Sequence, residues 1–159
     1  MRSEAGPSDL SGAEEALKGR ALTIAVVKNG KLIFSTNAPG LMAIFWAHKA
    51  LGGELAGSSV ADKVVGKAAA LIYAYHRVRA VFGATMSEGA LAVLRDRGIG
   101  LKFDRLVPVI KGKDGIRMCP FERVVMDARD PEEAVRVVSR MLSDADPFAA
   151  DGAKAHDRV

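Results

Sequence analysis

The amino-acid sequence predicts a single α/β domain in which a mixed sheet is sandwiched by helices. Its 159 residues, 49% of them hydrophobic, suit one domain with a sizeable core. Asn29-Gly30 lies between two apolar runs, 22–27 and 32–36, which is the strongest short-range signal for a β-hairpin. A strand–helix–strand pattern over 79–103 is typical of a βαβ crossover, whose two strands lie parallel.

The first part of the chain carries clear turn and helix signals. Residues 1–10 are small and polar, and we expect no regular structure there, whereas 11–20 predict a short amphipathic helix. After the hairpin, Asn-Ala-Pro-Gly at 37–40 breaks the chain. Residues 41–51 then predict a helix that two glycines end, followed by a loop over 55–59.

The segment 60–75, V-A-D-K-V-V-G-K-A-A-A-L-I-Y-A-Y, predicts one long helix that is apolar almost all round. A helix of this kind belongs inside a domain. It nevertheless carries Asp62, Lys63 and Lys67 in its first turns, and buried charges are costly unless they are paired, bound to something or reach the surface. We therefore expect a site at the start of this helix.

Further strands are predicted over 79–84, 99–103 and 106–110. Ser87 is expected to cap a helix that follows the first of these strands and ends before Gly98.

Two helices are predicted after these strands. A basic loop over 111–118 leads into a helix with Pro120 at its first position, and D-P-E-E at 130–133 starts a last helix that ends near Leu142. We divide the chain into an N-terminal extension (1–20), a single domain (21–142) and a flexible tail (143–159).

The net charge of +4 is unevenly distributed. Residues 21–142 hold 18 Lys and Arg against 11 Asp and Glu, which is +7, while both ends are slightly acidic. A basic body attracts anions such as phosphates, nucleotides and RNA, although ordinary solubility explains the charge equally well.

The sequence also bears on the cellular compartment. The single cysteine, Cys119, excludes an internal disulfide, and a reducing cytoplasm is the simplest location. The N-terminus has no apolar segment typical of a signal peptide. The uncharged part of the central helix, 68–75, is far shorter than the ~20 residues of a membrane span. We expect a cytoplasmic protein without membrane contact.

Three segments resemble a known family: V-A-D-K-V-V-G-K-A-A-A (60–70), S-E-G-A-L (87–91) and M-C-P-F-E (118–122). The chain is similar, from about residue 21 to 138, to the prokaryotic family catalogued as domain-of-unknown-function family 1893. The resemblance implies a cytidine-deaminase-like fold, a three-layer α/β/α sandwich that opens with a hairpin.

Zinc deaminases need an H-x-E motif followed by P-C-x-x-C. At the corresponding places this chain has Ala61-Asp62-Lys63 and 85–88, T-M-S-E. None of its three histidines lies at a credible ligand spacing from Cys119. We therefore expect no zinc-dependent deamination, no metal and no other cofactor.

The first group of candidate ligand-binding residues lies on the predicted central helix. Lys63 and Lys67 are four residues apart and would share a face, with Asp62 and Gly66 on an adjacent stripe. The lysines would hold a phosphate, Asp62 would accept hydrogen bonds from a ribose or base, and Gly66 would allow close approach. Alternatively, Asp62 complements the helix N-terminus and the lysines reach solvent.

A second group lies at two other predicted helix starts. Ser87 and Glu88 follow a strand, where the exposed N–H groups of a helix start suit an anion. Alternatively, Ser87 only caps the helix. Cys119, with Pro120, opens a later helix whose dipole favours a thiolate, or packs as a small buried residue. Glu122 could pair with a lysine of the central helix. The candidates for catalysis are the following: Lys67, Cys119 and Glu122.

Three functions remain open. The first is zinc-independent binding of a nucleotide or ADP-ribose-type ligand, and the second is a metal-independent enzyme acting on a nucleoside or nucleotide. The third is an RNA-binding or protein-interaction module that uses an Arg-rich surface, favoured less because aromatic residues are sparse there. A homo-oligomer is plausible by analogy with deaminase-like domains. The basic residues of that surface are Arg95, Arg97, Lys102, Arg105, Lys111, Lys113 and Arg117.

Overall fold

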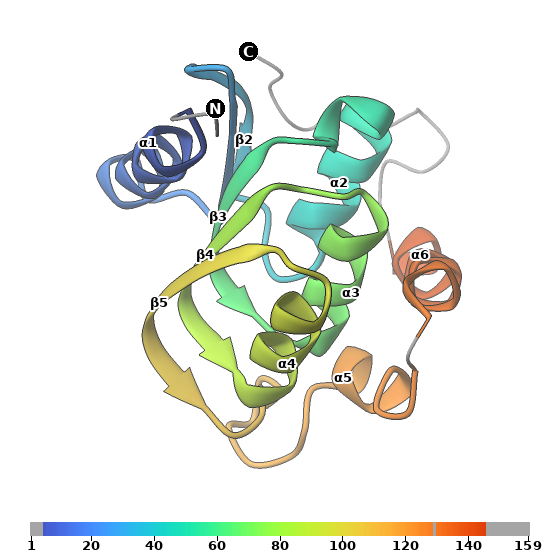
Figure 1. Ribbon diagram of the computed structural model, residues 1–159. Coiled ribbons are helices and arrows are strands. Elements are labelled where there is room, and N and C mark those ends of the chain that lie inside the picture. Colours follow the sequence, from blue (N-terminus) through green and yellow to red (C-terminus); the bar gives the residue numbers. More distant parts are fainter. Residues whose placement is uncertain (1–4, 129, 146–159) are drawn as a thin grey trace.

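The computed structural model describes residues 5–128 and 130–145 and shows a five-stranded sheet with strand order β2-β1-β3-β4-β5 (Figure 1). The strands are β1 (Ile24–Lys28), β2 (Lys31–Thr36), β3 (Ser59–Val65), β4 (Ala80–Ser87) and β5 (Gly100–Val107). The helices are α1 (Ala5–Gly19), α2 (Met42–Leu51), α3 (Lys67–Tyr75), α4 (Glu88–Asp96), α5 (Pro120–Val124) and α6 (Pro131–Ala145), with a 3₁₀ turn η1 (Gly52–Leu55).

The sheet is mixed, as predicted. Strand β1 is antiparallel to both β2 and β3, whereas β3, β4 and β5 run parallel to one another. The predicted crossover from β4 through α4 to β5 is confirmed. A second crossover, from β3 through α3 to β4, was not predicted, because its strand was assigned to a helix.

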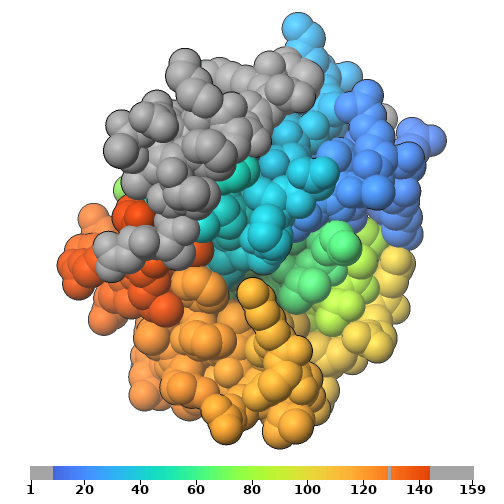
Figure 2. Space-filling model, turned by 180° about the vertical axis from the view of Figure 1, so that it is seen from behind, coloured from blue at the N-terminus to red at the C-terminus, as the bar shows by residue number. Residues whose placement is uncertain are grey.

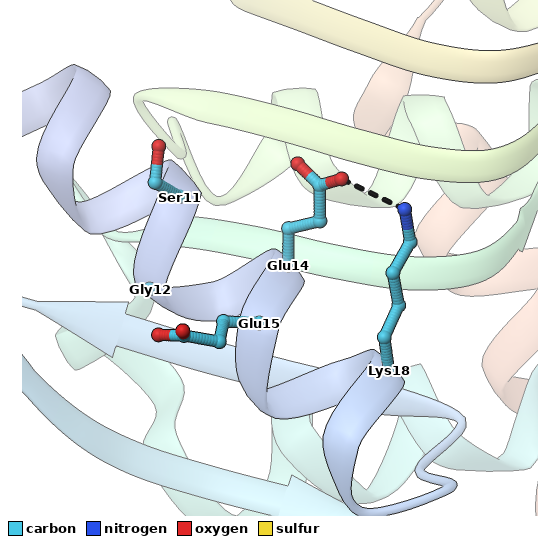
Figure 3. A pocket seen from close by; sticks show the side chains of 5 residues that line it. All are labelled: Ser11, Gly12, Glu14, Glu15 and Lys18. Carbon is cyan, nitrogen blue, oxygen red and sulfur yellow. Dashed lines mark hydrogen bonds and ion pairs between the residues drawn. The ribbon is translucent and has the colours of Figure 1, made fainter.

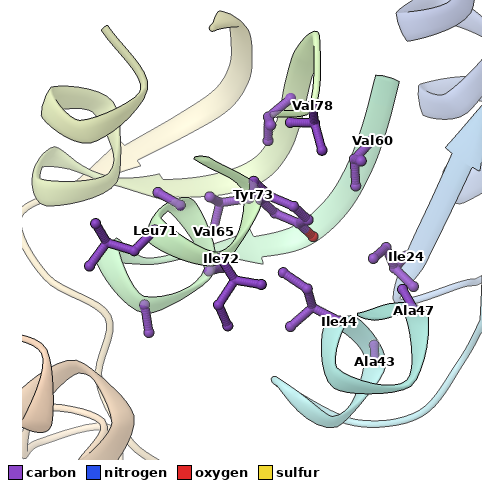
Figure 4. Close-up of a cluster of buried hydrophobic side chains, with 14 of the residues drawn as sticks. Ile24, Ala43, Ile44, Ala47, Val60, Val65, Leu71, Ile72, Tyr73 and Val78 are labelled. Carbon is purple, nitrogen blue, oxygen red and sulfur yellow. The ribbon is translucent and has the colours of Figure 1, made fainter. Parts of the chain in front are cut away.

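Helices cover both faces of the sheet (Figure 1). Among the described helices, α1 packs on one face, against β1, β3 and β4, while α2, α3 and α4 lie on the other face and α6 packs outside α3. The larger core lies beneath α2 and α3, where Tyr73 packs among Val60, Val65 and Val78 (Figure 4). The fold class predicted from the sequence, α/β with a mixed sheet between helices, is confirmed.

The predicted hairpin is confirmed in its turn chemistry. Asn29 and Gly30 both have positive φ, 53° and 78°, which suits the two central residues of a tight hairpin turn. The two oxygens of Asp9 accept hydrogen bonds from the N–H groups of Asn29 (3.0 Å) and Gly30 (2.9 Å). Asp9 thereby ties α1 to the hairpin, so the prediction that 1–10 lack regular structure is wrong from Ala5 onward.

Helix α1 is also joined to the sheet by an ionic cluster. Glu14 accepts hydrogen bonds from Lys18 and Lys102, both at 2.8 Å, and Lys18 lies 3.0 Å from Asp104. Both ammonium groups lie over the ring of the buried Phe82. Helix α1 therefore packs against the sheet from Asp9 onward, while the domain boundary predicted at residue 20 stays a prediction.

The predicted long helix over 60–75 is wrong in its first half. Residues Ser59–Val65 form β3, which pairs with β1 on one side and β4 on the other, and the helix starts only at Lys67. A strand covered on both faces is a nearly continuous apolar run, so its pattern resembles that of a buried helix. Gly66, in an extended conformation, separates the strand from the helix.

The two strands predicted over 99–103 and 106–110 are one continuous strand, β5. Asp104 and Arg105 suggested a break, but Arg105 pairs with Thr85 of β4. An edge strand with an exposed face tolerates such charges. The last helix ends at Ala145, three residues later than predicted, and the tail over 146–159 lies outside the described residues.

Candidate functional site

The carboxyl ends of β3 and β4 are each followed at once by a helix. Lys67 begins α3 and Glu88 begins α4, and a β-carbon added to Gly89 would lie 3.5 Å from the β-carbon of Lys67. Open sheets bind ligands at the carboxyl ends of their parallel strands. The structure thus brings Gly66, Lys67, Ser87 and Glu88 to one edge of the sheet.

Glu122 of α5 caps the amino terminus of α3. Its two carboxylate oxygens accept hydrogen bonds from the N–H groups of Lys67 (2.8 Å) and Ala68 (3.0 Å). The cap residue Gly66 has no side chain with which to satisfy these donors, so a residue 55 positions beyond Lys67 supplies the carboxylate. Burial raises the pKa of Glu122, although the two N–H groups and Lys67 oppose this shift.

The absence of a side chain at Gly66 makes that contact possible, while its predicted role beside a ligand stays a prediction. A β-carbon at this position would lie 2.6 Å from the carboxyl carbon of Glu122, closer than any real contact of this type. The predicted pairing of Glu122 with a lysine therefore takes another form, because Glu122 bonds to the backbone of Lys67. The glycine and the glutamate form one structural unit.

The ammonium group of Lys67 points to the chain that follows α5. Its Nζ donates a hydrogen bond to the carbonyl oxygen of Met126 at 2.6 Å. Lys67 therefore contacts α5 through its backbone N–H, which bonds to Glu122, and the turn after α5 through its side chain, which bonds to Met126.

A cleft of about 390 Å³ opens beside Lys67, between α3 and α4. Its wall on α4 is one helical stripe with spacing i, i+3, i+4, i+7, running over about 10 Å from Gly89 to Asp96. Sequence reasoning missed this stripe, although its spacing was visible. The lining residues are Lys67, Leu71, Gly89, Ala92, Val93, Asp96, Arg97 and Ala128.

Asp62 lies away from this cleft, in the interior. It is 6% exposed, and its Oδ2 accepts a hydrogen bond of 2.6 Å from the hydroxyl of Tyr73, which is itself buried. Burial raises the pKa of Asp62 to about 7, while the bonds from Tyr73 and from the N–H of Val64 oppose the shift. The prediction that Asp62 lines a helix face with Gly66 is wrong, because Asp62 lies in a strand and its side chain points into the interior, to Tyr73.

Lys63 is also misplaced in the prediction. Successive side chains of a strand point to opposite faces, and since Asp62 points towards α3, Lys63 points to the face that carries α1. It is exposed there and does not share a helix face with Lys67.

The remaining predicted residues have mainly structural contacts. The buried Ser87 caps α4, and its Oγ accepts a hydrogen bond of 3.0 Å from the N–H of Ala90, while Glu88 is exposed. Cys119 is half-buried at the start of α5, and its backbone N–H bonds to the carbonyl of Ile110 at 3.0 Å. Pro120 is the exposed first residue of α5, as predicted.

The donor atoms for a metal ion are dispersed. Within 5–128 and 130–145, no three His, Cys, Asp or Glu side chains group in a way that could hold a metal. His48 and His76 bond to each other, with Nδ1 and Nε2 2.8 Å apart, at the ends of α2 and α3. Ala61-Asp62-Lys63, which the prediction set on a helix, lie in β3, and α3 begins only at Lys67.

A second hollow, of about 440 Å³, lies along α1 (Figure 3). Its lining residues Glu14 and Lys18 pair with each other and with the sheet. We assign the charged groups of this hollow to the packing of α1 against the sheet.

In the part of the chain that the structure describes, no helix combines the length and the apolar character that crossing a membrane requires.

Comparisons with known proteins identify a family. The model described as "TM1506: Domain of unknown function (DUF1893)" matches residues 12–142. A DUF1893 family protein (TM1506) from Thermotoga maritima, known from a crystal structure, is 30% identical to this chain with a TM-score of 0.79. The match covers 89% of this chain and 97% of that one. Among curated proteins, none matches.

Two more distant structures are similar in part. The dCMP deaminase from the cyanophage S-TIM5 is 16% identical, with a TM-score of 0.43 over 65% of this chain and 99% of that one. Acinetobacter baumannii RibD is 17% identical, with a TM-score of 0.45 over 61% of this chain and 34% of that one. Both similarities are partial and say nothing of the chemistry of this chain.

Proposed function

This chain belongs to the DUF1893 family, and we propose that it binds a nucleotide-like small molecule, without zinc, in the cleft between α3 and α4. The cleft adjoins the edge where the parallel strands β3 and β4 end, which is the edge that open α/β sheets use for ligands. Its volume of about 390 Å³ falls in the range of small-molecule sites.

The observation that carries the proposal is the chemical variety of the cleft wall. Leu71, Ala92 and Val93 offer an apolar surface that suits the face of a base. Lys67 stands at the end nearest the helix amino termini and suits a phosphate, because its ammonium is a mobile point charge. At the opposite end, Asp96 can accept hydrogen bonds from a hydroxyl or an amino group.

The arrangement gives the ligand a direction. A phosphate at Lys67 and a base or sugar near Asp96 lie about 10 Å apart along α4, as the rise of a helix over seven residues requires. Arg97 adds positive charge at the far end of the cleft. A second phosphate or a second ribose there would suit an ADP-ribose-type molecule, so both ligand sizes belong in the test.

Calorimetric titration with nucleoside monophosphates, nucleoside diphosphates and ADP-ribose tests the proposal. We expect one of them to bind, and Lys67→Ala to weaken binding by about tenfold or more, the effect of losing a hydrogen bond to a charged group. Lys63→Ala is the matched control, since this lysine is exposed on the opposite face of the sheet and should leave affinity unchanged.

Two results would remove the proposal. One is the absence of heat with every ligand at millimolar concentration. The other is equal affinity of the wild type and Lys67→Ala, which would place any bound nucleotide outside this cleft.

A further inference from the structure

Building on the proposed function, we propose that residues 119–128 are a lid over the cleft, and that Lys67 couples closure of this lid to the bound phosphate. The segment contains α5 and the turn after it, and it forms part of the outer surface between β5 and α6 (Figures 1 and 2). Ala128, near its end, is one wall of the cleft.

The first attachment of the lid is the carboxylate of Glu122. It rests on the N–H groups of Lys67 and Ala68, and Gly66 leaves the space in which it lies. Glu122 does not line the cleft, so this attachment can be weakened without changing a ligand contact.

The second attachment is the hydrogen bond of 2.6 Å from Lys67 Nζ to the carbonyl of Met126. An ammonium group has three N–H donors, so one can hold the lid while the others face an anion in the cleft. The same side chain therefore lines the cleft and holds the lid.

The lid depends on these attachments because it has little structure of its own. Helix α5 spans five residues, which is far below the length at which a helix is stable alone. Val124 and Met126 are 46% and 49% exposed, so about half of their surface contributes no packing. Val125 is buried in the core, and the partly buried Phe121 and Ala128 pack against it, so the closed state is the majority.

Coupling through a shared group is reciprocal. If a closed lid orients Lys67 for the phosphate, a bound phosphate must also favour the closed lid. Loosening the lid at Glu122 should then weaken binding even though Glu122 touches no ligand. Glu122 is in this sense a positioning residue.

Hydrogen–deuterium exchange of the full chain, read by mass spectrometry, tests the lid without any ligand. We expect Glu122→Gln and Lys67→Met each to raise exchange over 119–128 by about tenfold, the effect of weakening one hydrogen bond to a charged group. Lys63→Met should behave as the wild type. Unchanged exchange in both variants, or an equal rise over the whole sheet, would overturn the lid.

The coupling is tested on the wild type with inorganic phosphate at millimolar concentration. We expect phosphate to slow exchange over 119–128 in the wild type and not in Lys67→Met. Slowing that is equal in both proteins, or absent in the wild type, would overturn the coupling. Failure of the proposed function has a different signature, since nucleotides would give no heat while the variants would still loosen the lid.

Discussion

Replacing Gly66 by Ala puts a methyl group 2.6 Å from the carboxyl carbon of Glu122. The backbone at Gly66 is extended, with φ −95° and ψ −177°, so alanine adopts it without strain. The methyl group therefore acts by displacing Glu122, a buried side chain that cannot shift without leaving its partners. The variant tests whether the carboxylate holds α3 as the structure shows.

The expected cost follows from the two hydrogen bonds that Glu122 accepts. Loss of a helix cap costs about 0.5–2 kcal/mol, and a hydrogen bond to a charged group contributes about 1.5–3 kcal/mol. Water can replace part of the lost hydrogen bonding. In addition, a change from Gly to Ala by itself stabilises a protein by about 0.4–1 kcal/mol, because it lowers the conformational entropy of the unfolded chain. We expect Gly66→Ala to lower the free energy of unfolding by about 2 kcal/mol.

A double-mutant cycle with Glu122→Ala, measured by urea unfolding, isolates the contact. Without the carboxylate nothing stands in the way of the methyl group, so Gly66→Ala should then be neutral or stabilising by about 0.4–1 kcal/mol. An equal cost of Gly66→Ala in both backgrounds would refute the reasoning, because the methyl group would then be disturbing something other than Glu122.

Three other predictions concern charged groups away from the cleft. Burial raises the folded-state pKa of Asp62 to about 7, so the contribution of Asp62 to the free energy of unfolding is present below pH about 4 and is lost as pH rises towards about 7. Asp62→Asn should abolish this part of the pH profile of urea unfolding, and parallel profiles of the two proteins would contradict the prediction. Burial lowers the pKa of His76 to about 4, with His48 adding to the shift, so the contribution of His76 makes the free energy of unfolding rise with pH between about 4 and about 6.5. His76→Gln should flatten that rise, and a nuclear magnetic resonance titration that finds an ordinary pKa for His76 would contradict the prediction. Glu14→Gln should lower the free energy of unfolding by about 1 kcal/mol or less in low salt and by less in high salt, since the ion pairs that lower the Glu14 pKa are partly exposed. Glu15→Gln, at an exposed neighbour, should have no measurable effect. Equal effects of the two changes would argue against the ionic cluster at α1.

Elements set by local backbone chemistry were predicted correctly from the sequence. Asn29-Gly30 closes the hairpin because both residues tolerate positive φ, and Ser87 caps α4 because its hydroxyl reaches the N–H of Ala90. The start of α6 at Pro131, after Asp130, belongs to the same class. In each case a few neighbouring residues contain the whole signal.

Prediction failed where burial removes the signal. Residues 59–62 of β3 are buried on both faces because β3 is a central strand between helices, and an alternation of buried and exposed residues then disappears. The sequence alone could not separate this strand from the helix that follows. Pairing with β1 and β4 decided it, and this moved Asp62 into the core and Lys63 to the far face.

The sequence by itself determined the family and the α/β class, and it predicted a site at the start of a helix over 60–75, which stays a prediction. Only the tertiary structure showed that Glu122, 55 residues beyond Lys67, occupies the amino terminus of α3, and that a stripe of α4 lines the adjacent cleft. The reason is physical. Turns and caps depend on a few adjacent residues, whereas a cleft and its lid depend on which distant surfaces the folded chain brings together.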